Sequence, residues 1–283
     1  MNGRHASIRD ALYEAPGPKT KRIVRLATAL SLAAAVLLVL VVVRRFYESG
    51  QLSPRYWSFF TRLTTWRFLG RGLVGTLEAA AAAGAMAFVL GFFLMLARIS
   101  RIRLLSGCAA VLVEFTRGVP TLLLIYFFFL VAPQLGWKLP AFWKISLPVA
   151  ISACGVVAEV LRSGVHAVPK GQREAALSLG MRESHVFFRV VFPQAFRYVV
   201  PALIAELVIV VKDTTFAYVV NFPDLMQNAK VLISNYDALL PVYLVVAVIY
   251  ILINLLLNAL SNRLARGAGP AAGPAGTGAG RSA

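Results

Sequence analysis

The sequence has few charged residues, and those it has are mostly basic. Charged side chains make up 14% of the 283 residues, whereas hydrophobic side chains make up 59%. Mean hydropathy is positive. A soluble domain of this length has more charge and fewer apolar residues. The composition therefore excludes an ordinary soluble domain and predicts a membrane protein.

The sequence is also poor in the residues that carry metal, redox and nucleotide chemistry. It contains two cysteines and three histidines, with no CxxC pair and no ligand spacing. Cys108 and Cys154 fall within apolar runs and are expected to be packing residues rather than a disulfide or a metal site. No GxxxxGKS or GxxxxGKT motif and no Ser/His/Asp cluster is present. We predict no catalytic residue, metal or cofactor, so any nucleotide must bind to another protein.

Six apolar runs are long enough to cross the hydrocarbon layer of a membrane, which takes about 20 helical residues. The runs are 26–43, 72–97, 105–132, 145–161, 201–221 and 241–260. Continuous runs, rather than alternating segments of about ten residues, favour helices over a β-barrel. The sequence therefore predicts an all-α, polytopic membrane bundle of about six transmembrane helices.

The first run, 26–43, follows a basic segment and has the outline of a secretory signal. It is longer than the apolar core of a signal, and it ends in Arg44 and Arg45 rather than in small residues at a cleavage site. We expect an uncleaved helix that is preceded by a cytoplasmic segment, 1–25.

Lys and Arg are unevenly divided between the two alternating sets of connecting segments. With both termini in the cytoplasm, 18 Lys and Arg fall on the inner side and 9 on the outer side. The inner segments are 1–25, 98–104, 162–200 and 261–283, and the outer ones are 44–71, 133–144 and 222–240. The positive-inside rule therefore predicts that both termini are cytoplasmic. The net charge of +17 reflects this topology and does not indicate a nucleic-acid partner.

Two flanking segments have distinctive compositions. The outer segment 44–71 is basic and aromatic, which is typical of a stretch at the membrane interface. Its aromatic residues include Tyr56, Trp57, Phe59, Phe60 and Trp66. The tail 264–283 is rich in Gly and Ala, and we predict that it is disordered.

The longest internal polar interval, 162–200, has the pattern of a helix, a turn and a second helix. Pro169 suits the start of a helix, Glu174 lies early in it, where the helix dipole favours an anion, and Gly180 suits the left-handed position after it. A narrow stripe of small residues would let another surface approach the backbone of this helix closely. It consists of Ala175, Ala176 and Leu179. The pattern alone leaves two alternatives open, a docking hairpin or one that lies on the membrane or packs under its own bundle.

Residues 174–193, EAALSLGMRESHVFFRVVFP, closely resemble the cytoplasmic EAA loop in the membrane subunits of ABC importers. The family pattern is EAA-x3-G-x9-I-x-LP, and here Val190 and Phe192 stand for Ile and Leu. Other stretches are similar to the polar amino acid permease subfamily: GTLEAA (75–80), LARISRIRLL (96–105), VEFTRGVP (113–120), VPKGQREAALSLG (168–180), VFPQAFRYVVPAL (191–203) and VKDTT (211–215). AELVIV (205–210) departs from an Asn-containing segment common in relatives.

The resemblance implies a type I ABC importer permease in a bacterial plasma membrane, with a five-helix core over 72–263 and one extra N-terminal helix. It implies that the 162–200 loop docks on a separate cytoplasmic ABC ATPase dimer. The matching coupling residues are Gly171, Gln172, Glu174, Ala175, Ala176 and Gly180. It also implies an extracellular solute-binding protein and a sister permease, or a second copy of this chain, as partners.

The N-terminal helix and the preceding LYEAPGPK (12–19) resemble the longer glutamate-type permeases of high-GC Gram-positive bacteria. Glutamate is therefore the expected cargo. The alternative is an autonomous secondary amino acid transporter. Many such carriers contain inverted repeats, and the sequence contains no internal repeat, which favours a half-transporter.

Charges inside a bilayer are costly and are usually functional or paired. Glu114 and Arg117 lie three residues apart, so they either pair on one helix face or line the translocation path. Lys212 and Asp213 are adjacent and cannot face each other on a helix, so a role in gating or bundle structure is expected. Glu206 is expected to lie buried between helices, whereas Glu78 and Glu159 are expected to reach the interface.

Overall fold

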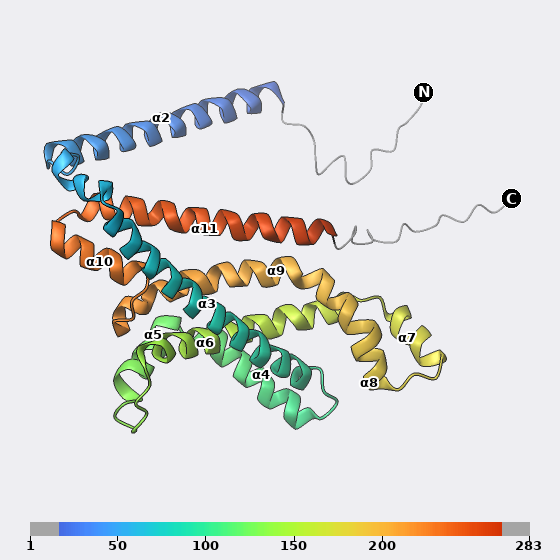
Figure 1. Ribbon diagram of the computed structural model, residues 1–283. Helices are drawn as coiled ribbons and strands as arrows, with labels where there is room; N and C mark the ends of the chain where they lie inside the picture. Colours follow the sequence, from blue (N-terminus) through green and yellow to red (C-terminus); the bar gives the residue numbers. More distant parts are fainter. Residues whose placement is uncertain (1–16, 268–283) are drawn as a thin grey trace, which may run out of the picture. The chain divides into compact units, whose positions relative to one another are not determined.

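The computed structural model describes residues 17–267, which are almost entirely helical and include no β-strand (Figure 1). The predicted all-α fold is confirmed over this range. The chain divides into two units, Met1–Trp57 and Ser58–Ala283. Residues 268–283 of the predicted disordered tail and residues 1–16 of the predicted N-terminal segment lie outside the described residues.

The first unit consists of one long helix and a short turn. Helix α2 (Pro18–Glu48) is apolar on all sides in its middle part, 26–43, and no residue of its most apolar stretch is buried. Such a helix fits a lipid environment, since water would contact every apolar side chain. The structure confirms the predicted helix at 26–43 and extends it at both ends. A 3₁₀ turn, η1 (Pro54–Tyr56), follows.

The second unit contains the remaining candidate spans. Four of its helices are long and apolar enough to cross a membrane, and a bent helix pair supplies one more. Counted with α2, they agree with the predicted number of about six. In chain order the elements are η2 (Ser58–Thr61), α3 (Leu63–Arg98), α4 (Arg103–Gly118), α5 (Thr121–Tyr126), the π-helical η3 (Phe127–Val131), α6 (Ala141–Ala167), α7 (Lys170–Ser178), α8 (Glu183–Val186), the π-helical η4 (Phe187–Val191), α9 (Phe192–Asp213), η5 (Thr214–Val220), α10 (Leu225–Tyr236) and α11 (Leu239–Gly267).

The predicted span at 105–132 is not one straight helix, because the chain bends by 94° between α4 and the α5–η3 helix. Pro120 is the cause. It disfavours helical geometry in the residue before it, and Val119 is extended, with φ −86° and ψ 123°. The chain then begins a new helix at Thr121.

Helix α3 begins nine residues before the predicted span at 72–97, within the segment predicted to lie at the interface. Helix α10 holds the first turns of α3, since the side-chain amide of Asn228 donates to the backbone carbonyl of Phe68 at 2.7 Å. Helix α3 also lies close to the residue that precedes α10. A Cβ on Gly72 would lie 2.7 Å from the backbone carbonyl oxygen of Asp224. Tertiary contacts therefore continue the helix beyond its apolar part.

Helix α6 is the centre of the second unit and packs against α3, α4 and α9. Glycines permit these close contacts. A Cβ on Gly91 of α3 would lie 2.8 Å from the carbonyl oxygen of Cys154, and a Cβ on Gly155 would lie 2.9 Å from that of Val113 in α4. On the other side of α6, a Cβ on Gly164 would lie 2.9 Å from a carbonyl oxygen of α9. Small residues of this kind let membrane helices pack backbone to backbone.

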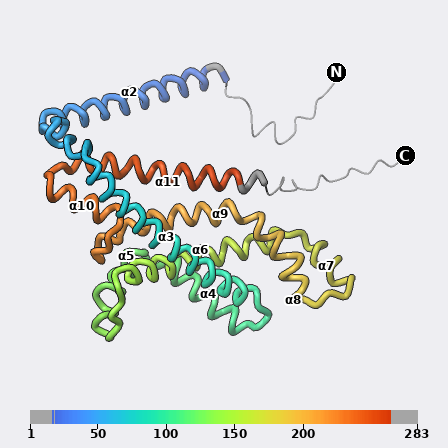
Figure 2. Tube along the Cα trace, in the orientation of Figure 1, coloured from blue at the N-terminus to red at the C-terminus, as the bar shows by residue number. Residues whose placement is uncertain are grey.

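The α7–α8 hairpin, residues 168–191, connects α6 to α9. Figure 2 shows the chain leaving the bundle at the end of α6, turning through α7 and α8, and returning as α9. The short connection between α3 and α4 lies at the same end of the bundle (Figure 1). The structure therefore contains the helix–turn–helix that the sequence predicts at this position.

Candidate functional site

The turn of the α7–α8 hairpin depends on Gly180. Its φ of +77° is left-handed, and the amide of Met181 donates to the carbonyl of Ala176 while that of Gly180 donates to Leu177. These two bonds form a Schellman motif, which ends a helix and reverses the chain. The predicted left-handed position of Gly180 is confirmed.

The inner face of the hairpin has its own small hydrophobic cluster. Ala176 is 5% exposed, and it belongs to the same cluster as Val168, Val186, Val191 and Ala195. The predicted exposed stripe is therefore wrong at Ala176, because α7 turns this residue toward α8 and α9.

The outer face of the hairpin carries the other motif residues, which are exposed: Gly171, Gln172, Glu174, Ala175 and Gly180. Leu179, at the tip, is 83% exposed. A Cβ on Gly171 or Gly180 would meet no atom within 4 Å. The face is open at these two glycines, so another backbone could approach it closely there.

Two polar side chains on α7 differ in their contacts. The Gln172 carbonyl oxygen accepts from Gln194 of α9 at 3.4 Å, and Gln194 also donates to the carbonyl of Val190 at 2.9 Å. Gln172 thus helps to hold α7 against α9. Among residues 17–267, the Glu174 carboxylate forms no ion pair and no hydrogen bond, so it is available to donors on another chain.

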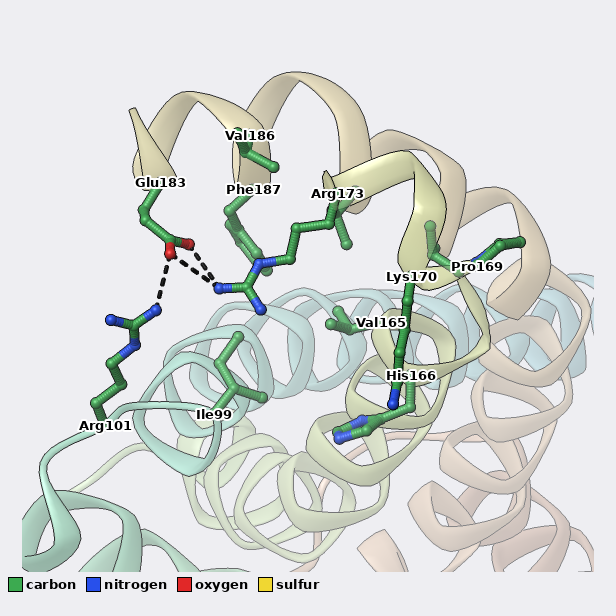
Figure 3. Close-up of a pocket in the computed structure, with 12 residues that line it drawn as sticks. Ile99, Arg101, Val165, His166, Pro169, Lys170, Arg173, Glu183, Val186 and Phe187 are labelled. Atoms are coloured by element: carbon green, nitrogen blue, oxygen red, sulfur yellow. Dashed lines mark hydrogen bonds and ion pairs between the residues drawn. The ribbon is translucent and has the colours of Figure 1, made fainter. Parts of the chain in front are cut away.

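A cleft of about 430 Å³ separates the hairpin from the α3–α4 connection (Figure 3). Glu183, the first residue of α8, binds two arginines at its edge. Arg173 of α7 donates to both carboxylate oxygens, at 2.9 and 2.8 Å, and Arg101 of the connection donates at 2.8 Å. Lys170 and His166 also line the cleft. Sequence reasoning missed this site, because Arg101 and Glu183 are 82 positions apart.

The four charged residues predicted to line the path or act in gating fall into two separate places. Glu114 and Arg117 form an ion pair within α4 at 3.5 Å, which is one of the two predicted alternatives, and their side chains are 70% and 43% exposed. Lys212 is exposed. Asp213 accepts a hydrogen bond from Thr121 at 2.9 Å, and the Thr121 hydroxyl also lies 2.8 Å from that of Ser152. Within the described part of the chain, no hydrogen bond or ion pair joins the two places.

The other acidic residues of the spans have distinct surroundings. Glu159 does more than reach the interface, since it pairs with Arg162 at 2.7 Å and with Arg98 of α3 at 3.5 Å. Glu206 is 7% exposed, as predicted. It lines an apolar groove of about 550 Å³ between α3 and α9. Glu78 is exposed.

No cluster of metal-ligating side chains is present among the described residues. Cys108 and Cys154 are free thiols. Cys154 is buried in the core of the second unit, as expected for a packing residue, whereas Cys108 is exposed on α4. Binding through the residues described above would therefore depend on ionic and apolar contacts.

Comparison with known proteins identifies the class. Residues 87–269 match the family described as the inner membrane component of binding-protein-dependent transport systems. The chain belongs to this family, and its fold is that of a type I ABC importer permease.

Similar proteins fall in the same class. The glutamate transport system permease protein GluD of Corynebacterium glutamicum is 35% identical over 185 residues, which are 64% of this chain and 67% of GluD. The L-cystine transport system permease protein TcyL of Bacillus subtilis is 33% identical over 170 residues, 58% of this chain and 71% of TcyL. The crystal structure of an amino acid ABC transporter with histidines matches with a TM-score of 0.68 and 30% identity, over 74% of this chain and 97% of that chain.

Proposed function

We propose that this chain is the permease subunit of an ABC importer for polar amino acids and that its α7–α8 hairpin docks on a cytoplasmic ATPase. The observation that carries the docking role is the outer face of α7. It combines Glu174, whose carboxylate has no ion pair or hydrogen bond within residues 17–267, with small or absent side chains at Gly171 and Ala175. Such a face suits close contact with a groove that supplies hydrogen-bond donors.

The membrane orientation follows from charge. Both termini are cytoplasmic, because the basic residues favour that arrangement by 18 to 9. The ion pair between Arg101 and Glu183 supports one part of this topology. It joins two segments, 98–104 and 162–200, that this topology assigns to the same side.

The cargo that we propose is glutamate. GluD supports this choice, and so does the sequence resemblance of the N-terminal helix to glutamate-type permeases. TcyL is nearly as similar and is named for cystine, so selection needs a direct test. A solute-binding protein encoded beside this chain would be purified and its thermal unfolding measured with glutamate, glutamine, arginine and cystine. We expect the largest stabilisation with glutamate, and a larger shift with another amino acid would refute that choice.

Glu174→Lys tests the docking role. The substitution reverses the charge at the proposed contact, and loss of one partner in a desolvated charged contact costs about 2–5 kcal/mol. In proteoliposomes with the ATPase, the binding protein and the sister permease or a second copy, we expect stimulated ATP hydrolysis and uptake to fall together. Glu48→Lys is the control, since it reverses an exposed charge at the end of α2, which the proposed topology puts on the other side of the membrane.

Two other outcomes of this experiment would lead to different conclusions. If uptake by the wild-type chain proceeds without the ATPase, is driven by an ion gradient and is indifferent to Glu174→Lys, the chain is an autonomous secondary transporter. If uptake needs the ATPase but Glu174→Lys behaves like Glu48→Lys, the importer stands and α7 is not its docking helix.

A further inference from the structure

Glu183 joins three segments at one carboxylate. It begins α8, it binds Arg173 of α7 through both oxygens, and one of these oxygens also binds Arg101 of the α3–α4 connection. Figure 3 shows the two guanidinium groups approaching this carboxylate from different sides. Arg173 therefore closes the hairpin on itself, whereas Arg101 links the hairpin to a separate part of the bundle.

The α3–α4 connection is short and well ordered by its own hydrogen bonds. Only four residues, 99–102, separate the two helices. The hydroxyl of Ser106 donates to the carbonyl of Arg98 at 2.9 Å, and the amide of Ile102 donates to the hydroxyl of Ser100 at 3.2 Å. Because these hydrogen bonds restrict the connection, a displacement of Arg101 should also displace the adjoining ends of α3 and α4.

We propose that Arg101 is a positioning residue for coupling: through Glu183 it makes the α3–α4 connection follow the α7–α8 hairpin. A movement of the docked hairpin then reaches α3 and α4 directly, in addition to α6 and α9, which the chain itself joins to the hairpin. This inference rests on the proposed docking function and adds a second route from the ATPase into the membrane helices.

The solvent exposure of the Arg101–Glu183 ion pair favours a role in coupling over a role in folding. The Arg101 side chain is 82% exposed and that of Glu183 is 53% exposed. Exposed ion pairs contribute little to stability and weaken as salt concentration rises. Loss of Arg101 should therefore leave the fold intact and change how well the connection follows the hairpin.

The test compares Arg101→Gln with Arg103→Gln. Both remove one positive charge near the start of α4, but Arg103, the first residue of α4, forms no ion pair among the described residues. Arg101→Lys keeps the charge and serves as the conservative variant. The measurement is the amount of radiolabelled L-glutamate taken up per ATP hydrolysed, in proteoliposomes holding the complete importer.

We expect Arg101→Gln to lower uptake per ATP by about threefold, the change in an equilibrium constant that corresponds to an exposed ion pair. Arg101→Lys should restore most of it, and Arg103→Gln should match the wild type. Hydrogen exchange in the full-length chain gives a second readout, in which the amides of residues 99–102 should exchange faster in Arg101→Gln and in Glu183→Gln than in Arg103→Gln.

Four results would overturn the proposal. Equal uptake per ATP in Arg101→Gln and Arg103→Gln, with a coupled wild type, refutes the inference alone. Unchanged hydrogen exchange at 99–102 removes its structural basis. Loss of bound ATPase from Arg101→Gln would make Arg101 part of the docking surface instead. If wild-type uptake needs no ATPase, the proposed function fails first and this inference fails with it.

Discussion

Asp224→Asn should change how the stability of the chain depends on pH. Asp224 is fully buried just before α10, and one of its carboxylate oxygens accepts the amide of Gln227 at 2.7 Å. Its other oxygen and the hydroxyl of Tyr250 are buried with no hydrogen-bond partner among the described residues. Burial raises the pKa of Asp224 from its ordinary value of 3.8 to about 6, and no charged neighbour opposes that shift.

The sign and size of the effect follow from that pKa. Because the folded chain holds this proton to higher pH than the unfolded chain does, the free energy of unfolding falls as pH rises from about 4 to about 6 and stays low above that. A shift of about 2 pH units corresponds to about 3 kcal/mol. About 2 kcal/mol of this should be lost between pH 4.5 and pH 7.5.

Asparagine is a suitable replacement because it resembles the neutral acid and does not titrate. It is as good a helix N-cap as aspartate. Asp237→Asn is the matched control, since Asp237 is an exposed carboxylate at the other end of α10. Its left-handed φ of 53° is one that asparagine tolerates.

The assay is equilibrium unfolding of the purified chain in detergent with increasing SDS. The advantage of Asp224→Asn over the wild type should be about 2 kcal/mol larger at pH 7.5 than at pH 4.5, and Asp237→Asn should show no such change. An advantage that is the same at both pH values, or an Asp224→Asn chain less stable than the wild type at pH 7.5, would refute the reasoning.

Three further predictions follow. Gly180→Leu should abolish uptake while leaving membrane insertion intact, because a Cβ at a left-handed position costs roughly 1 kcal/mol and a large side chain obstructs the open face; normal uptake at normal expression would contradict this. Gly155→Val should lower the free energy of unfolding by about 1–3 kcal/mol, since its Cβ meets Val113 and Thr116, whereas Gly107→Ala, in open space, should not. A reporter fused after residue 283 should be active only if it is a cytoplasmic type, and activity of a periplasmic type would overturn the topology.

Local sequence signals predicted the parts of the site that depend on local geometry. Gly180 could be placed because a left-handed residue after a helix is a property of a few neighbouring residues. The bend after α4 had a comparable signal in Pro120, but the long apolar run at 105–132 obscured it. The start of α3 had none, because its first turns depend on contacts with α10, about 160 residues away.

The ionic contacts were beyond the reach of sequence patterns. Arg101 and Glu183 lie 82 positions apart, and Thr121 and Asp213 lie 92 positions apart. Nothing in the spacing of such residues indicates that they meet, since their meeting depends on how the helices pack. The burial of Ala176 was missed for a related reason. Its neighbours Val186, Val191 and Ala195 belong to the returning arm of the hairpin and to α9.

The two kinds of contact in the second unit suit different tasks. Gly91 and Gly155 bring α3, α4 and α6 into backbone contact, and closely packed interiors resist continuous deformation. These helices should therefore move together as one block. The hairpin is joined to this block by the chain at the end of α6. It also contacts the α3–α4 connection through an exposed ion pair at Arg101, which can break and re-form at little cost. A movement of the hairpin would therefore reach the block through α6, and the weaker contact at Arg101 would set how closely the α3–α4 connection follows.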